Sequence, residues 1–439
     1  MKYTTIAIIG RPNVGKSSLF NVLTRSRQAI VDDQAGVTLD RHYGYANFEN
    51  QQFIIVDTGG YTNDEEQPLQ KLLNSQVLQA IDESDILLLV VDAKEGLISL
   101  DQELADRLRK TSKPVITVVN KAENYDQTTA QQEFYGLANT ITKISTAHKI
   151  GIEELYQKII TLSPDTGSGE DREHSPPTLA IIGRPNAGKS TLTNKIIGRN
   201  QVLVSEIPGT TRDSIYLDFI YKDRDYRLID TAGLRRKSRI SANTIERYSV
   251  LRSMKAIIDA DVVALMIDAA LEISEQDCRL FNHIQTIGRP TIIILNKWDL
   301  LDDYQKDMIK KNLDFRLRQI VSKDVLTCTA ATGYGVSRIL DLFISKYKLS
   351  QSTVSTAKLN QIFQQITEEH PAPQKNGKRP KLTYAHLAGV KPHKIIIHGK
   401  RLGYISDDYK RFLQGALQKK LNLIGLPLKL IFKNPKHDE

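Results

Sequence analysis

The stretch IAIIGRPNVGKSSLFN at residues 6–21 decides the fold, because it returns as LAIIGRPNAGKSTLTN at residues 179–194. A second motif, DTGG at residues 57–60, returns as DTAG at residues 230–233, again 173 residues later. Two separate motifs that keep one register indicate an internal repeat. We therefore read the chain as two copies of one unit.

Each copy alternates apolar strand runs with amphipathic helical runs. ITVVN (116–120) and IIILN (292–296) have strand length, and both end on the Asn of an Asn-Lys pair, 176 residues apart. ELADRLRK (103–110) and GIEELYQKI (151–159) have helical spacing. This alternation predicts an α/β fold in which each copy forms a mostly parallel sheet covered by helices.

A polar segment separates the copies. SPDTGSGEDREHSPP at residues 163–177 is too rich in Pro, Gly and charge to build a core. We predict a first domain at 1–162, this linker, a second domain at 178–350 and a third at 351–439. The third is predicted to be a small α/β module in the order helix, strand, strand, helix, strand, at residues 357–370, 381–388, 394–398, 407–421 and 427–433.

Composition limits the partners. The net charge is +9, yet residues 352–439 carry 16 Lys/Arg against 6 Asp/Glu, so the rest of the chain sums to −1. A basic tail behind near-neutral domains favours contact with phosphates, most plausibly those of nucleic acid; a merely soluble basic surface is the alternative. Seven cations are candidates for phosphate contacts or for docking on another domain: Lys378, Arg379, Lys381, Lys391, Lys394, Lys400 and Arg401.

The remaining composition favours a cytoplasmic protein. Two cysteines, Cys278 and Cys328, lack the spacing of a zinc ribbon or disulfide framework, so we expect two buried thiols in a reducing compartment. No histidine pair has metal-ligand spacing. The apolar runs have strand length, short of a membrane helix, and the opening residues run straight into a glycine loop rather than a signal peptide. We expect no membrane partner and no stable homo-oligomer.

The repeated glycine motif carries the chemistry. Gly-x4-Gly-Lys-Ser follows an apolar strand and precedes a helix in both copies, which is the context of a nucleotide phosphate loop. Its backbone N–H groups and the helix N-terminus attract phosphate. We expect Lys16 and Lys189 to reach the β- and γ-phosphates, and the hydroxyls of Ser17 and Ser190 to bind Mg²⁺.

The metal site needs further ligands. Asp57 and Asp230 end apolar strands at the sheet edge beside the loop, where Mg²⁺ sits in phosphoryl-transfer sites. A threonine must also close over the metal and the γ-phosphate. The second copy offers two neighbouring threonines, and the register of the repeat selects Thr211, which matches Thr38. Gly60 and Gly233 can offer an N–H to the γ-phosphate.

The base site differs between the copies. In Asn296-Lys297-Trp298-Asp299, the aspartate can accept from N1–H and the 2-amino group of guanine, so adenine is rejected because a buried acceptor would go unpaired. The first copy has Asn120-Lys121-Ala122-Glu123 instead. A carboxylate one methylene longer predicts weaker or less selective guanine binding there.

The predicted contacts with GTP or GDP therefore cover three motifs in each copy. In the first they are Gly10, Arg11, Pro12, Asn13, Val14, Gly15, Lys16, Ser17, Ser18, Asp57, Thr58, Gly59, Gly60, Asn120, Lys121, Ala122 and Glu123. In the second they are Gly183, Arg184, Pro185, Asn186, Ala187, Gly188, Lys189, Ser190, Thr191, Asp230, Thr231, Ala232, Gly233, Asn296, Lys297, Trp298 and Asp299.

With these motifs in place, nearly the whole chain resembles the Der (EngA) family of bacterial tandem GTPases, of the TrmE-Era-EngA class. The resemblance implies GTP hydrolysis, a role in assembly of the large ribosomal subunit with its ribosomal RNA, and a KH-like C-terminal domain. The Gly-x-x-Gly loop with which KH domains clamp RNA is absent, since GKRLG at 399–403 has one residue too many. Two alternatives are a GTPase of another RNA pathway, such as tRNA modification, and an RNA-binding scaffold with one structural nucleotide site.

The catalytic group is also inferred from resemblance. Tyr61 and Leu234 stand where Ras-like enzymes keep a water-orienting glutamine. In related GTPases with this substitution, K⁺ held by a phosphate-loop asparagine supplies positive charge to the transition state, and the matching residues are Asn13 and Asn186. The alternative is that these asparagines only cap the loop. The resemblance thus implies hydrolysis activated by K⁺ and by the ribosome.

Overall fold

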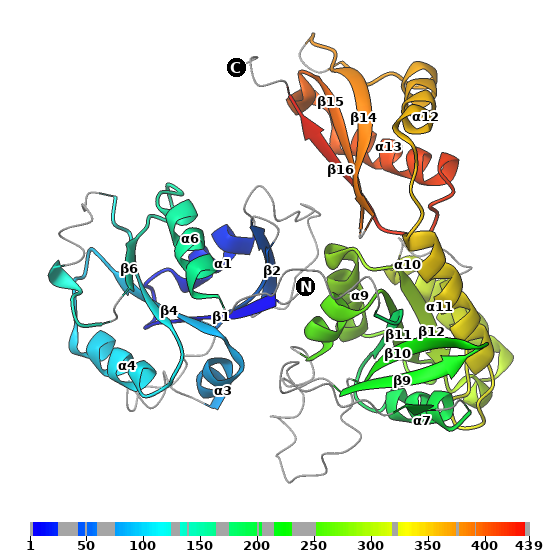
Figure 1. Cartoon of the computed structure of the whole chain (residues 1–439), viewed down its shortest axis with the longest axis horizontal. Coiled ribbons are helices and arrows are strands. Elements are labelled where there is room, and N and C mark those ends of the chain that lie inside the picture. The colour runs from blue at the N-terminus through cyan, green and yellow to red at the C-terminus, as the bar shows by residue number, and fades with distance from the viewer. Residues whose placement is uncertain are drawn as a thin grey trace. The chain divides into compact units, whose positions relative to one another are not determined.

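A computed structural model describes residues 3–24, 43–48, 51–58, 75–123, 132–137, 140–163, 175–199, 202–203, 215–230, 252–317, 324–374, 377–390 and 392–434. The chain divides into two compact units, Met1–His174 and Ser175–Glu439 (Figure 1). Each unit is described by itself below.

The first unit is a six-stranded sheet with helices on both faces. Its strand order is β2-β3-β1-β4-β5-β6, and all neighbours are parallel except the edge pair of β2 and β3. Its strands are β1 (Tyr3–Ile9), β2 (Tyr43–Phe48), β3 (Gln51–Asp57), β4 (Ile86–Asp92), β5 (Val115–Asn120) and β6 (Thr140–Lys143). Its helices are α1 (Lys16–Thr24), α3 (Ser75–Glu83), α4 (Ser99–Arg109) and α6 (Ile152–Leu162).

Burial explains why the central strands read as unbroken apolar runs. Every residue of β1 and β4 is buried, because helices cover both faces of a parallel sheet. Side chains that alternate along β4 belong to two cores: Leu87 and Leu89 face one, and Leu88 and Val90 the other. The expected helix-covered parallel sheet is thus confirmed.

The second unit repeats this architecture. Its seven-stranded sheet has the order β13-β12-β11-β7-β10-β9-β8, with β8 and β9 as antiparallel additions at one edge. The strands are β7 (Thr178–Ile182), β8 (Val202–Leu203), β9 (Ile215–Tyr221), β10 (Arg224–Asp230), β11 (Val262–Asp268), β12 (Thr291–Asn296) and β13 (Val325–Thr327). The helices are α7 (Lys189–Arg199), α9 (Glu275–Ile287), η2 (Trp298–Leu300), α10 (Asp303–Arg316) and α11 (Val336–Ser350).

The same unit also holds the small C-terminal module. It has the expected order, with α12 (Thr356–Glu369), β14 (Lys381–Val390), β15 (His393–Lys400), η4 (Leu402–Tyr404), α13 (Asp407–Lys420) and β16 (Leu428–Lys433). Strand β15 lies in the middle, antiparallel to β14 and parallel to β16. Both long helices cover one side of this sheet (Figure 1), where Phe363, Ile397 and Leu413 share a core.

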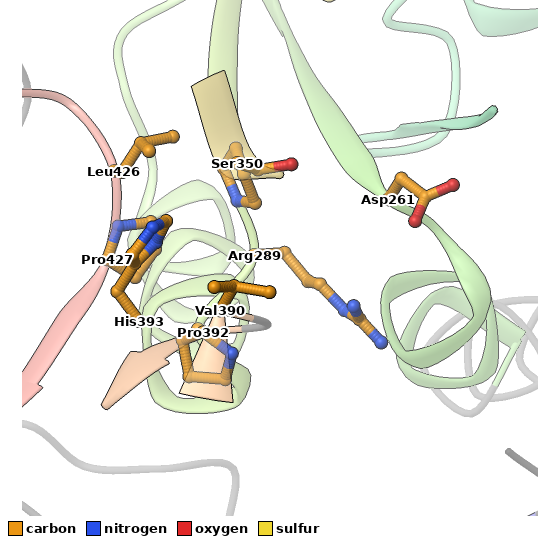
Figure 2. Close-up of a pocket in the computed structure, with 10 residues that line it drawn as sticks. Asp261, Arg289, Ser350, Val390, Pro392, His393, Leu426 and Pro427 are labelled. Atoms are coloured by element: carbon orange, nitrogen blue, oxygen red, sulfur yellow. The ribbon is translucent and has the colours of Figure 1, made fainter. Parts of the chain in front are cut away.

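Polar contacts hold this module against the preceding α/β fold of the same unit. A buried ion pair joins Lys346 of α11 to Asp324 at 2.6 Å, and the same ammonium donates to the carbonyl oxygen of Gly425 at 2.8 Å. His393 lies 2.9 Å from the carbonyl oxygen of Ser352. Figure 2 shows the cleft at this junction, lined by Asp261, Gly288, Arg289, Pro290, Ser350, Val390, Pro392, His393, Leu426 and Pro427. No residue predicted to contact nucleotide lines it.

One expectation about the thiols is wrong. Cys328 is buried, but Cys278, in the first turns of α9, is only partly buried. Burial raises the pKa of the Cys328 thiol to about 11 and also raises the pKa of Cys278. Within the described residues, no helix is long and apolar enough to cross a membrane.

Candidate nucleotide sites

Both phosphate loops curl tightly between a strand and a helix. Gly15 and Gly188 have φ values of +95° and +102°, in the region that only glycine adopts without strain. A Cβ at Gly15 would lie 2.3 Å from Nδ2 of Asn120, and one at Gly188 would lie 2.2 Å from Nδ2 of Asn296. The second glycine of the motif is therefore required by the base-site asparagine as well as by the turn.

Each loop closes around its own lysine. Lys16 donates to the carbonyl oxygen of Arg11 at 2.7 Å, and Lys189 donates to those of Gly183 and Arg184 at 2.8 and 2.7 Å. Lys16 is buried, and burial lowers the pKa of its ammonium, an effect that Asp57 opposes electrostatically. The loop thus has the shape and positive charge that a phosphate group requires.

The base-site asparagines bind the phosphate loop directly. Asn120 donates to the carbonyl oxygen of Val14 at 2.9 Å and accepts from the N–H of Thr146 at 3.2 Å. In the second copy, Asn296 donates to the carbonyl oxygen of Ala187 at 2.8 Å and accepts from the N–H of Ala330 at 2.9 Å. In each copy the buried amide uses both its nitrogen and its oxygen, so it holds the phosphate loop, the Asn-Lys segment and the loop after the last strand in one arrangement. Sequence motifs about 106 residues apart thus meet at one site.

The base-site lysines are held by two carboxylates that sequence reasoning missed. Lys121 lies 2.5 Å from the carboxylate of Asp92, and Lys297 lies 2.5 Å from Asp268. Burial would raise the pKa of Asp92, but hydrogen bonds from Lys121 and from the backbone of Lys94 more than offset it, so the pKa is lowered. The two aspartates end β4 and β11 at the 176-residue offset of the Asn-Lys pairs, a repeat that could have revealed them.

Asp299 and Glu123, the carboxylates predicted to face guanine, have equivalent partners although their side chains differ in length. Asp299 accepts from the hydroxyl of Thr329 at 3.0 Å, and Glu123 accepts from that of Ser145 at 3.2 Å. Glu123 also lies 3.8 Å from Lys94. The longer carboxylate in the first copy therefore accepts a hydrogen bond from a hydroxyl at the equivalent position.

Arg11 and Arg184, which are predicted to contact nucleotide, both pair their guanidinium groups with carboxylates outside the phosphate loop. Arg11 binds Asp101 of α4 at 3.2 Å and also Glu95, and Arg184 binds Asp277 of α9 at 2.9 Å. Both helix aspartates are fully buried. These ion pairs connect the first phosphate loop to α4 and the second to α9. In the sequence, the only signal for this contact is that Asp101 and Asp277 lie 176 residues apart, as the Asn-Lys pairs do.

Of the other residues predicted to contact nucleotide, some are exposed, some are partly buried, and some lie outside the described parts. Asn13 and Asn186 are exposed and have left-handed backbone, with φ of 66° and 63°. Also exposed are the equivalent positions Pro12 and Pro185, and Ser18 and Thr191. Ser17 and Ser190 lie at the start of α1 and α7. Thr58 donates to the carbonyl oxygen of Ile8 at 2.6 Å. Residues outside the described parts are Thr38, Gly59, Gly60, Thr211, Thr231, Ala232, Gly233 and the side chain of Asp230.

The fold and these loops define a class: the chain is a P-loop GTPase with two GTPase domains and a KH-like C-terminal domain. The profile described as "50S ribosome-binding GTPase" matches residues 5–121 and 178–297. The profile described as "KH-domain-like of EngA bacterial GTPase enzymes, C-terminal" matches residues 353–433. The chain belongs to the GTPase Der family, and it is a GTPase.

Whole-length relatives carry this assignment. GTPase Der of Idiomarina loihiensis is 41% identical, over 98% of this chain and 93% of that protein. GTPase Der of Acidithiobacillus ferrooxidans is also 41% identical, over 98% of this chain and 96% of that one. Among solved structures, an Aquifex aeolicus Era variant bound to GDP and aluminium fluoride aligns with a TM-score of 0.31 at 18% identity, over 58% of this chain and 92% of that one. So low a score carries no functional argument.

Proposed function

We propose that both domains bind and hydrolyse GTP, and that the protein uses this cycle in assembly of the large ribosomal subunit. The profile that matches both domains describes a 50S ribosome-binding GTPase, and the C-terminal residues 352–439 carry the whole excess of positive charge. A switch of this kind docks in one nucleotide state and leaves in the other. Ribosomal RNA is then the phosphate-rich partner of the basic module.

The proposed binding mode follows from the loops. Lys16 and Lys189 release the loop carbonyls that they now bind and hold the β- and γ-phosphates. Mg²⁺, which neutralises charge developing on these phosphates, fits beside Ser17 and Asp57, because Asp57 already acts electrostatically on Lys16. Ser190 and Asp230 are assigned the same role in the second domain, with Thr38 and Thr211 as the closing ligands.

For base recognition we assign Asp299 and Glu123. The hydroxyl of Thr329 fixes the Asp299 carboxylate at 3.0 Å, where it can accept from guanine. In the first domain Glu123→Asp restores the shorter carboxylate, so we expect tighter and more selective GDP binding. The measurement is competition of GDP against ADP at the first site, in a chain whose second site is disabled by Lys189→Ala. Unchanged selectivity would show that the glutamate already serves guanine fully.

K⁺ activation through Asn13 and Asn186 is the proposed catalytic device. Both asparagines have left-handed backbone, so an alanine there adds strain that could mimic a catalytic defect. Asn13→Gly and Asn186→Gly remove the carboxamide and keep the backbone accessible. If the side chain holds K⁺, these variants lose stimulation of GTP turnover by KCl over NaCl. If the asparagine only shapes the loop, the glycine variants keep it.

The ribosomal role has its own test. We expect isolated large subunits to accelerate GTP turnover in KCl, and the protein to sediment with them in the presence of a nonhydrolysable GTP analogue. The small subunit is the matched control. Turnover that responds to neither subunit would leave a GTPase of another pathway.

A further inference from the structure

Two basic side chains flank the carboxylate of the first base site. Nζ of Lys94 lies 3.8 Å from one oxygen of Glu123, and Nε2 of His148 lies 3.9 Å from the other. The hydroxyl of Ser145 donates to the oxygen that faces His148, at 3.2 Å. Among the described residues, no side chain donates a hydrogen bond to the oxygen on the Lys94 side, so that oxygen stays available to a base.

The second copy has no lysine at the position of Lys94. The N–H of Lys94 donates to the carboxylate of Asp92 at 2.9 Å, and the N–H of Ala270 donates to that of Asp268 at 3.1 Å. Asp92 and Asp268 end equivalent strands, β4 and β11. Ala270 therefore occupies the place of Lys94, and its methyl group can neither donate a hydrogen bond nor carry a charge.

The second copy also lacks the histidine. Ser145 and Thr329, which bind the two base-site carboxylates, each close a β-bridge with the residue five positions later. His148 and Thr332 follow them by three positions, so these two residues are equivalent. Within the described parts of the chain, Asp299 forms no ion pair. In these parts, basic groups beside the carboxylate thus distinguish the first site from the second.

The ammonium of Lys94 can serve a ligand as well as attract Glu123. A separation of 3.8 Å is too long for a hydrogen bond, so the N–H groups of this ammonium are not committed to the carboxylate. The Lys94 side chain is 65% exposed, which leaves it room to turn toward a bound base. A hydrogen bond from its own backbone, the charge of Lys94 and the hydroxyl of Ser145 lower the pKa of Glu123, so the carboxylate is ionised at neutral pH. The site therefore presents an acceptor and a donor next to each other.

An acceptor beside a donor matches some purines better than others. Guanine offers N1–H and a 2-amino group, which are both donors, so the ammonium of Lys94 would oppose the amino group. Xanthine keeps N1–H but carries an oxygen at C2, which accepts. Hypoxanthine keeps N1–H and has only hydrogen at C2. Because an unmatched polar group in a site costs affinity, the three bases report separately on the acceptor and on the donor.

We propose that Lys94 is a specificity-determining residue that opens the first nucleotide site to purine nucleotides with an oxygen at C2. Glu123 accepts from N1–H of the base, and Lys94 donates to the 2-oxygen. His148 and Ser145 hold the other oxygen of Glu123. The second site, which lacks the lysine, stays selective for guanine. The inference rests on the proposed nucleotide binding by the first domain, whose range of ligands it extends to xanthine nucleotides.

The test is competition among GDP, xanthosine diphosphate (XDP) and inosine diphosphate (IDP) in the full chain, with the second site disabled by Lys189→Ala. IDP is the reference, because its base has no polar group at C2. Lys94→Met removes the ammonium and keeps the length of the side chain. It should reduce the preference for XDP over IDP about tenfold, which is the effect of one lost hydrogen bond to a charged group. Lys110→Met, at an exposed lysine after α4, is the control and should change nothing.

The second site provides the reverse experiment, in a chain whose first site is disabled by Lys16→Ala. Asp299→Glu alone copies only the longer carboxylate. Adding Ala270→Lys to it should raise the preference for XDP over IDP about tenfold. An unchanged preference would mean that a lysine at this position does not reach the base.

The outcomes separate this inference from the proposed function. The inference is overturned if Lys94→Met leaves the preference for XDP over IDP at the first site unchanged while GDP still binds. It is also overturned if Ala270→Lys produces no gain at the second site. A first site that binds none of the three nucleotides would refute the proposed nucleotide binding by this domain, and the inference with it. GDP binding by each variant shows that its site is folded.

Discussion

The ion pair that fastens the second phosphate loop supports a quantitative prediction. The carboxylate of Asp277 is fully buried in the first turn of α9. It accepts from the guanidinium of Arg184 at 2.9 Å, and from the backbone N–H and hydroxyl of Ser274 at 3.0 and 2.9 Å. Asp277→Asn keeps the volume of the side chain but removes its charge. The NH₂ of the new amide can then face a group that donates, such as the N–H of Ser274 or the guanidinium of Arg184.

The expected cost follows from burial. Breaking one partner of a fully buried ion pair costs about 3–5 kcal/mol, and a hydrogen bond to a charged group contributes about 1.5–3 kcal/mol. Arg184 is 20% exposed, so water can partly solvate it once it is unpaired. We therefore expect a loss of about 2–3 kcal/mol in the free energy of unfolding of the second domain.

Trp298 provides the assay, because it is the sole tryptophan and lies in this domain beside the base-site lysine. Urea unfolding followed by its fluorescence reports the domain that contains Asp277. The control is Glu275→Gln on the same helix, which breaks the exposed pair with Arg279 at 3.3 Å. An exposed pair contributes at most about 1 kcal/mol.

GDP affinity at the second site adds a functional readout. Arg184 lies in the phosphate loop between Gly183 and Lys189, so loss of its anchor should weaken GDP binding in Asp277→Asn and not in Glu275→Gln. The reasoning is refuted if the two variants unfold at the same urea concentration. It is also refuted if Asp277→Asn binds GDP as tightly as wild type.

Three further predictions concern buried groups. Lys346→Met removes the ammonium of a buried ion pair from the carboxylate of Asp324, so it should cost about 3–5 kcal/mol in urea unfolding, and adding Asp324→Leu should recover most of it. Cys328, with its pKa raised to about 11, should resist a thiol reagent at pH 8 until the protein is unfolded. Gly188→Ala should abolish GDP binding at the second site in equilibrium titrations, because its Cβ would lie 2.2 Å from Nδ2 of Asn296; retained binding would contradict this geometry.

Local signals explain which parts of the fold could be predicted. The phosphate loops and the Asn-Lys pairs have fixed spacing to a strand and a helix, so short stretches of sequence suffice to place them. The C-terminal order of elements was also predictable, since α13 was expected at 407–421 and spans Asp407–Lys420. The ion-pair partners could not be predicted in this way. Asp101 and Asp277 have no local signal that sets them apart from other helix residues, and only the fold brings Arg11 and Arg184 to them.

The sequence by itself determined the class of protein, the two nucleotide motifs and the departure of Glu123 from Asp299, because these depend on residue identity at short fixed spacing. Only the tertiary structure decided which distant groups meet. It joined Lys121 to Asp92, brought Glu123 to the hydroxyl of Ser145, and joined Arg184 to Asp277. The physical reason is that strand register and helix packing fix such contacts, and both depend on the whole core rather than on neighbouring residues.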